Sequence, residues 1–186
     1  SKCHDDLKDG AGNNVSISSH WRSTMMANAA KDPFWQAKVK SEVQRNPSLA
    51  KEIEKKCVTC HMPMAWIQAG VKKKQFKLHG VNSILDEFLD PKSTLHNAAM
   101  DGVSCSLCHQ IKDEKLGTPE SFSGEYIIDT KTVSPHRPLY GPFREVYQET
   151  MISTVGFTPV YGPHMNDSAF CATCHTLYTP YVDAAG

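Results

Sequence analysis

Six of the seven cysteines in this chain form three pairs with the same spacing, and a histidine directly follows the second cysteine of every pair. The three stretches are Cys57-Val58-Thr59-Cys60-His61, Cys105-Ser106-Leu107-Cys108-His109 and Cys171-Ala172-Thr173-Cys174-His175. Residues i, i+3 and i+4 of a helical turn share one face, so both thiols and the imidazole can reach a single partner. This spacing is the attachment signature of haem c, in which the thiols bond the haem vinyl groups and the histidine binds the iron. We therefore predict three haems.

Two other chemistries use paired cysteines, and both fit the pattern less well. Zinc knuckles contain Cys-x-x-Cys pairs, but zinc does not require a histidine after the second cysteine. Histidine makes up 9 of the 186 residues, so the probability that chance places one after all three pairs is on the order of 1 in 10,000. A thioredoxin-like redox site needs a single pair beside a β-α-β pattern. Haem is therefore the interpretation that the motifs favour.

The seventh cysteine extends the pattern to the start of the numbering. Cys3 and His4 have the order of the last two residues of the same motif, with Ser1 and Lys2 as its spacers. The first cysteine of that motif would precede Ser1, so we expect the numbering to begin inside a longer protein. A free thiol, or a haem held by one thioether, is the alternative. With Cys3 and His4 included, we predict about four haems.

The amino-acid composition favours a fold that depends on a large apolar cofactor. Valine, isoleucine, leucine and phenylalanine together make up 37 of the 186 residues, and the net charge is zero. Such a low aliphatic fraction is poor material for a core, so we expect haem to supply part of it and folding to depend on haem. Zero net charge gives no sign of nucleic-acid binding. The sequence has no run of 18 apolar residues that would predict a transmembrane helix.

The chain has more histidines than the motifs need. Four of them are the expected proximal iron ligands: His4, His61, His109 and His175. The other five are candidate distal ligands: His20, His79, His96, His136 and His164. An iron with two histidine ligands has no open position, which suits electron transfer, although the seven methionines keep His/Met ligation open. Five candidates for four irons also leave one histidine that can serve a haem of another chain or segment.

Helix signals occupy much of the chain. The dipeptide Asp32-Pro33 predicts a capped helix over 33–45, after an earlier helix over 19–30. Asn46-Pro47 repeats the signal and predicts a third helix that leads into Cys57. We expect the haem motifs at helix starts, joined by long loops. Further elements are expected as helices over 82–89, 93–100 and 145–153, a hairpin over 117–128 and an extended loop over 134–142.

Together these signals predict a mainly α fold with long loops and little β structure, an irregular multihaem cytochrome fold wrapped around stacked haems. The motif recurs at spacings of 48 and 66 residues, which is too irregular for a solenoid. We expect a single domain over residues 1–186 that is truncated within a motif at its N-terminus. Its C-terminus can also be a truncation point.

Four blocks of the sequence resemble large bacterial multihaem c-type cytochromes. The blocks are residues 20–30 followed by Asp32-Pro33, residues 57–65, residues 101–111 and residues 171–178. The resemblance implies a periplasmic, cell-surface or extracellular electron carrier, because haem c is attached outside the cytoplasm. The partners to expect are redox proteins or further haem-bearing segments.

Three functions are compatible with these features. An electron-transfer wire needs every iron closed by two protein ligands. A multihaem oxidoreductase of the nitrite or hydroxylamine type needs one open iron beside acid and base groups, and the surplus of histidines argues against that. A subunit of an extracellular filament or oligomer would use a histidine of one copy to close a haem of the next. We favour the wire, which makes the chain an electron carrier rather than an enzyme.

Overall fold

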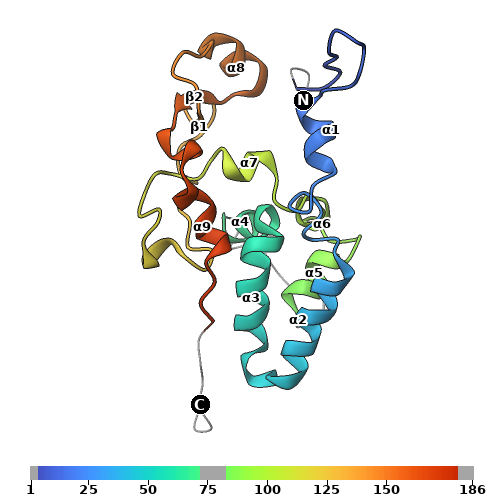
Figure 1. Cartoon of the computed structure of the whole chain (residues 1–186). Coiled ribbons are helices and arrows are strands. Elements are labelled where there is room, and N and C mark those ends of the chain that lie inside the picture. Colours follow the sequence, from blue (N-terminus) through green and yellow to red (C-terminus); the bar gives the residue numbers. More distant parts are fainter. Residues whose placement is uncertain (1–3, 72–82, 180–186) are drawn as a thin grey trace. The chain divides into compact units, whose positions relative to one another are not determined.

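The computed structural model describes residues 4–71 and 83–179, and backbone contacts divide the chain into two compact units. Unit 1 spans Ser1–Ser104 and unit 2 spans Cys105–Gly186. Helices and loops dominate both units, and one small sheet is the principal β structure in the described residues (Figure 1). The expectation of a mainly α fold with long loops is thereby confirmed. The expected single domain stays a prediction.

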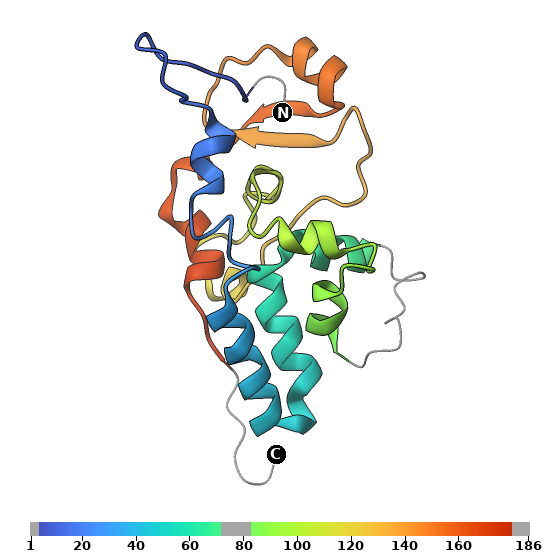
Figure 2. The same ribbon diagram turned by 90° about the vertical axis from the view of Figure 1, so that its right-hand side faces the viewer.

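The regular elements of unit 1 among the described residues are all helices. Its elements are α1 (Ile17–Arg22), α2 (Pro33–Arg45), the 3-10 helix η1 (Pro47–Leu49), α3 (Ala50–His61), α4 (Pro63–Val71), α5 (Ile84–Leu89) and α6 (His96–Met100). Helices α2 and α3 lie side by side (Figures 1 and 2), and α3 also packs against α4 and α5.

Unit 2 combines short helices with two strands. Its elements are α7 (Cys105–Cys108), the 3-10 helix η2 (Pro119–Ser121), β1 (Pro138–Gly141), α8 (Gln148–Val155), β2 (Thr158–Tyr161), the 3-10 helix η3 (Pro163–Asn166) and α9 (Ser168–His175). The strands pair in parallel, with Pro138 opposite Thr158 and Gly141 opposite Tyr161. Helix α8 makes the crossover between them and packs on β2 (Figure 2). The extended loop expected over 134–142 therefore contains a strand.

The cap predicted for the helix over 33–45 is present. The Asp32 carboxylate accepts the backbone N–H of Phe34 at 2.9 Å, and Pro33 occupies the first turn. The second predicted cap is wrong, because the Asn46 side chain donates to the carbonyl of Glu42 and so closes the end of α2. The residues after it form η1 before α3 begins.

The helix predicted over 19–30 is also wrong in extent, because α1 ends at Arg22 and a series of turns follows. The Thr24 hydroxyl donates to the carbonyl of Trp21 and accepts the N–H of Ala27. The Asn28 amide donates to the carbonyls of Arg22 and Thr24. Such side-chain hydrogen bonds compete with the backbone pattern of a helix. They explain why an apolar-looking segment forms turns here.

The described residues also test four further expected elements. Helix α5 lies within the range 82–89, and α6 within 93–100. The predicted helix over 145–153 is α8, displaced by a few residues and ended by Gly156, whose φ of +69° suits a glycine C-cap. The hairpin over 117–128 is wrong, because Ile128 bridges Ile111 outside that range.

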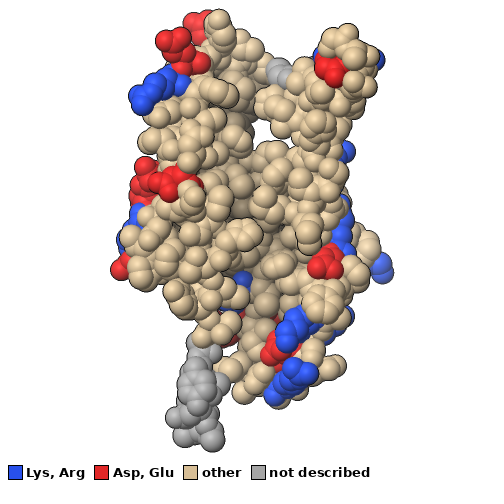
Figure 3. All heavy atoms as spheres, viewed as in Figure 1, with Lys and Arg blue, Asp and Glu red and all other residues tan. Residues whose placement is uncertain are grey.

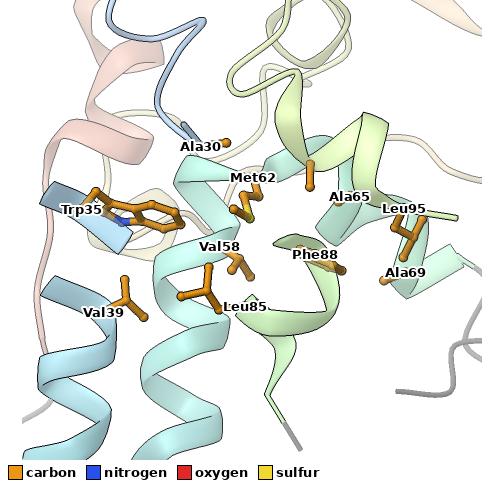
Figure 4. Packing of buried hydrophobic residues seen from close by; sticks show 11 residues of the cluster. Ala30, Trp35, Val39, Val58, Met62, Ala65, Ala69, Leu85, Phe88 and Leu95 are labelled. Atoms are coloured by element: carbon orange, nitrogen blue, oxygen red, sulfur yellow. The ribbon is translucent and has the colours of Figure 1, made fainter. Parts of the chain in front are cut away.

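The hydrophobic core lies in unit 1 (Figure 4). Its buried cluster consists of Ala30, Trp35, Val39, Val58, Met62, Ala65, Ala69, Leu85, Phe88, Leu95 and Ala99. Leu107 and Ile111 are the buried aliphatic residues among those described in unit 2, and Pro159 on β2 is also buried. Unit 1 therefore has a core of its own, whereas unit 2 has very little.

Charge is spread over the surface without a dominant sign. On the face shown in Figure 3, acidic and basic side chains are intermixed and most atoms belong to uncharged residues. Several of the charges pair locally, as Lys38 does with Glu42 on α2 at 2.5 Å. This distribution agrees with a net charge of zero.

Candidate haem-attachment sites

The first complete motif forms the C-terminal turn of α3. The helix runs without a break to His61, so Cys57, Cys60 and His61 share one face. Val58 lies between the cysteines and is fully buried in the cluster of unit 1. Cys57 packs partly against the same cluster. The motif is therefore attached directly to the packed core of unit 1.

A buried carboxylate holds this helix in place. Glu54, one turn before the motif, accepts the Ser83 hydroxyl at 2.5 Å and the Ile84 backbone N–H at 2.7 Å. Because the carboxylate is only 5% exposed, these hydrogen bonds replace those it would make to water. They tie α3 to the first turn of α5.

The imidazole of His61 interacts with the segment 29–35. Its Nδ1 donates to the backbone carbonyl of Ala29 at 3.3 Å. The indole of Trp35 stacks on the ring at 4.4 Å between centroids and 7° between planes. Burial lowers the pKa of His61, while the Ala29 hydrogen bond and the charge of Asp32 act in the opposite direction. With the proton on Nδ1, the lone pair of Nε2 is the one available to a metal.

The second motif begins α7, and its histidine is hydrogen-bonded to β1. The backbone N–H of His109 donates to the Cys105 carbonyl at 3.0 Å, so the helical turn includes the histidine. Nδ1 of His109 donates to the carbonyl of Tyr140 at 2.5 Å, and the Tyr140 N–H donates back to the His109 carbonyl at 2.7 Å. The ring again engages Nδ1 and leaves Nε2 available.

The third motif forms the end of α9, and the loop at 121–124 clamps it. The Asp167 carboxylate caps the helix by accepting the N–H of Ala169 at 2.8 Å. The Thr173 hydroxyl donates to the Ser121 carbonyl at 2.7 Å, and the Gly124 N–H donates to the Thr173 carbonyl at 2.7 Å. The spacer residue Thr173 is thus part of the fold, while Cys171 and His175 are exposed.

Two of the three motifs end helices, and only the one at α7 begins a helix. The expectation that the motifs sit at helix starts is therefore wrong for α3 and α9. The reason is that the packed or capped part of each helix precedes its motif. The attachment residues then occupy the last turn, where the histidine ring can reach carbonyls outside the helix.

The buried thiols have raised pKa values. Burial raises the pKa of Cys57 to about 11, with smaller contributions from Cys60 and Glu54. Burial likewise raises the pKa of Cys108 to about 11, and the charges of Cys105 and Cys171 contribute. As free thiols, both stay protonated at neutral pH. The influence of Cys171 on Cys108 places the two motifs of unit 2 within electrostatic reach of each other.

Two of the distal candidates are held in opposite orientations. His96, at the start of α6, directs Nδ1 at the Phe88 carbonyl at 3.1 Å and keeps Nε2 available. His164 instead donates from Nε2 to the Ile111 carbonyl at 3.0 Å. Its Nδ1 is buried and has no hydrogen-bond partner among the described residues. The nearest acid, Asp113, lies 4.0 Å away.

Gly162 shapes the free edge of His164. A Cβ at this position would lie 2.7 Å from Cε1 and 3.2 Å from Nδ1 of the imidazole. The rings of Tyr140 and Phe170 meet His164 edge to face at 5.2 and 5.8 Å. The unpartnered nitrogen therefore sits in an aromatic enclosure that only glycine leaves open on this side.

For the other predicted site residues the structure shows mainly how exposed they are. His4, His20 and His136 are exposed. Cys174 is half-buried on α9. Cys3 and His79 lie outside the residues that the structure describes.

These features fit a covalently bound haem. Each described motif offers two cysteines and one histidine in a helical turn, and His61 and His109 both have Nδ1 engaged by a backbone carbonyl. Metal-binding histidines almost always donate their second ring N–H in this way, which fixes the tautomer and raises the basicity of the ligand. Nδ1 of His164 is a further buried ring nitrogen that has no hydrogen-bond partner among the described residues.

Nothing in the sequence indicates which residues orient these rings. Ala29, Phe88 and Tyr140 act through backbone carbonyls, which every residue has. Only Trp35 had a weak signal in the sequence, because it lies three residues after Asp32, the expected N-cap of a helix. A capped first turn predicts a rigid residue, but it does not predict which ring the residue meets.

The motifs and the ring orientations are the features expected of c-type cytochromes, proteins that carry covalently attached haem. Comparison with known families agrees: residues 1–83 match the family described as cytochrome c554 and c-prime. That range includes Cys3-His4 and the complete motif of α3. The resemblance to multihaem c-type cytochromes is thereby confirmed. No curated protein matches the chain, and no solved structure does.

The described helices can be compared with the length and hydropathy of a membrane span. Within residues 4–71 and 83–179, none of them combines the length and the apolar character needed to cross a bilayer. This agrees with the hydropathy of the sequence.

Proposed function

We propose that this chain transfers electrons through about four covalently attached haems, most of them held between two histidines. When bound, the haem iron supplies a one-electron ferric/ferrous couple. The observation that carries the proposal is the common orientation of His61, His96 and His109. Each engages Nδ1 with a backbone carbonyl and keeps Nε2 for a metal.

The cysteines anchor the cofactors and the histidines close the irons. The proposed attachment residues are Cys3, Cys57, Cys60, Cys105, Cys108, Cys171 and Cys174, with His4, His61, His109 and His175 as proximal ligands. The proposed distal ligands are drawn from His20, His79, His96, His136 and His164. His96 would bind through Nε2, while His164 has Nδ1 available. Closed irons leave no position for a substrate, which favours electron transfer over an oxidoreductase.

Exposed histidines support a second candidate function. His20 and His136 both lie on the surface, so either can reach a haem of another copy. The chain would then be a subunit of an extracellular filament or oligomer. In that case assembly would convert high-spin haem to low-spin haem as the protein concentration rises, and His136→Ala or His20→Ala would prevent the conversion.

We further propose a periplasmic, cell-surface or extracellular location, because haem c is attached outside the cytoplasm and c-type cytochromes are typically extracytoplasmic. The partners would be redox proteins or further haem-bearing segments. Cell fractionation followed by haem staining would test the location.

Two measurements on the purified protein test the main proposal. Mass spectrometry of the denatured chain should show three or four haem additions, about four if Cys3 carries one. Electron paramagnetic resonance should show low-spin haems only. A bare polypeptide mass would overturn the proposal, and a large high-spin signal that binds carbon monoxide would favour an oxidoreductase.

Variants then locate the distal ligands. His96→Ala and His164→Ala should each convert one haem to a high-spin form that binds carbon monoxide. Asn97→Ala, next to His96 and exposed, is the matched control and should leave the spectrum unchanged. If a histidine variant stays low-spin, that residue is not a distal ligand.

A further inference from the structure

Three groups from one short segment converge on His61. The Ala29 carbonyl accepts its Nδ1 proton, the Trp35 indole covers its face, and the Asp32 carboxylate adds a negative charge nearby. At His109, by contrast, a carbonyl is present but no aromatic ring of the described residues stacks on the imidazole. The surroundings of His61 are therefore different in kind.

Trp35 is held rigidly enough to orient another ring. It lies in the first turn of α2, which Asp32 and Pro33 fix. Its side chain is 9% exposed and belongs to the buried cluster of unit 1 with Val39 and Val58 (Figure 4). A 7° angle between the rings is an offset or parallel stack, an arrangement that adds an energy of its own beyond the buried area. The imidazole cannot rotate without breaking this stack.

We propose that Trp35 is the positioning residue of the His61 iron site, and that with Ala29 and Asp32 it lowers the reduction potential of the haem bound there. The inference rests on the proposed electron-transfer function. Hydrogen bonding of Nδ1 raises the basicity of a ligating imidazole, and a more basic ligand beside a negative charge favours the ferric state. Second-shell bonds and nearby charge are the means by which a protein sets a haem potential. Trp35 keeps the ring in the plane where the Ala29 bond forms.

Substitution of Trp35 separates this role from mere packing. In the haem-loaded protein, Trp35→Leu should change the reduction equilibrium constant of one haem about tenfold in favour of the ferrous state. For one electron the substitution thereby raises the midpoint potential by about 59 mV. It should also shift the low-spin g values of that haem in electron paramagnetic resonance. Trp35→Phe keeps a flat ring and should restore most of both properties. Phe34→Leu is the matched control, because Phe34 is the adjacent aromatic and is 79% exposed.

A second variant tests the electrostatic part. Asp32→Asn removes the charge but can still cap α2, so it should raise the same potential without lowering helix stability. It also serves as the test if Trp35→Leu fails to fold. Haem content by mass must match the parent protein for each variant compared, and circular dichroism must show that each variant is folded at the temperature of the titration.

The outcomes distinguish the inference from the function on which it rests. If no covalent haem is found, the proposed function fails. If all haems are present and Trp35→Leu and Asp32→Asn leave every midpoint potential and g value unchanged, the inference is overturned while electron transfer stands. Equal shifts for Trp35→Leu and Phe34→Leu would also overturn it.

Discussion

Unit 1 and unit 2 both contain Cys-x-x-Cys-His motifs, but different contacts hold these motifs in place. In unit 1 the motif ends a twelve-residue helix, α3, whose Val58 belongs to a cluster of eleven buried apolar residues. In unit 2 two motifs share a segment in which only Leu107 and Ile111 are buried aliphatic residues among those described. Hydrogen bonds to backbone carbonyls hold the motifs there. They join His109 to Tyr140, and they join α9 to the loop at 121–124.

The difference sharpens the expectation that folding depends on haem. The low aliphatic fraction of the sequence is an average over two unequal parts. Burial of apolar area stabilises a protein by about 25 cal/mol per Å², so a unit with two buried aliphatic side chains needs another source of burial. A haem offers a large apolar surface, and unit 2 has two motifs to hold haems. We therefore expect haem loss to affect unit 2 far more than unit 1.

The largest effect is expected from removing a haem of unit 2. In Cys105→Ala/Cys108→Ala, unit 2 should lose its compact fold, because little else fills its interior. Limited proteolysis followed by mass spectrometry should show rapid cleavage within residues 105–179. In the matched variant Cys57→Ala/Cys60→Ala, helices α2 to α5 should remain protected, since their cluster persists. Equal protection of unit 2 in both variants would contradict the contrast between the units.

Truncation of a core side chain in unit 1 should have the next largest effect. Leu85→Ala removes a side chain that is 1% exposed and should lower the free energy of unfolding by about 2–5 kcal/mol through lost burial and a cavity. Denaturant unfolding followed by circular dichroism measures the loss. Leu7→Ala is the control in the same unit, because Leu7 is 41% exposed, and it should cost less than about 0.5 kcal/mol. Similar costs for both would mean that the cluster is not a core.

Loss of a helix cap should have a smaller effect, and an equal one in the two units. Asp167→Ala in α9 and Asp32→Ala in α2 each remove one carboxylate that accepts a backbone N–H. Each should cost about 1 kcal/mol, because capping is local and does not depend on the core. Asn at either position should restore most of the loss. Hydrogen exchange in the first turn of each helix checks the prediction, and a much larger cost in α9 would show that its cap also supports the haem motif.

The smallest effect concerns an exposed loop of unit 2. The Thr132 hydroxyl and the backbone N–H groups of Thr132 and Lys131 lower the pKa of Asp129 from 3.8 to about 2. The ionised carboxylate therefore stabilises the loop above pH 3.8, and this contribution is lost as the pH falls towards about 2. In Thr132→Val the pKa should move back up towards 3.8, measured by an NMR titration of Asp129. An unchanged titration would show that the backbone donors alone set the pKa.

Local sequence determined a large part of this protein. The motif Cys-x-x-Cys-His predicts both the cofactor and its ligand, because the chemistry lies within five consecutive residues. Asp32-Pro33 predicts the start of α2 for the same reason, since a cap and its target are neighbours. Asn46-Pro47 gave the same signal, and the helix that it predicted is present as α3, but the expected cap is not, because the Asn46 side chain donates to the carbonyl of Glu42 on the preceding helix. Local signals are reliable only when no tertiary or neighbouring partner competes.

Tertiary structure alone decided how each histidine is used. His96 and His164 cannot be distinguished by residue type. In the structure Nδ1 of His96 donates to the Phe88 carbonyl, whereas Nε2 of His164 donates to the Ile111 carbonyl. The parallel pairing of β1 with β2 and the stack of Trp35 on His61 are also invisible in the sequence. The physical reason is that these contacts use backbone carbonyls and flat ring faces, which are common to many residues. Only the path of the folded chain selects which of them meet.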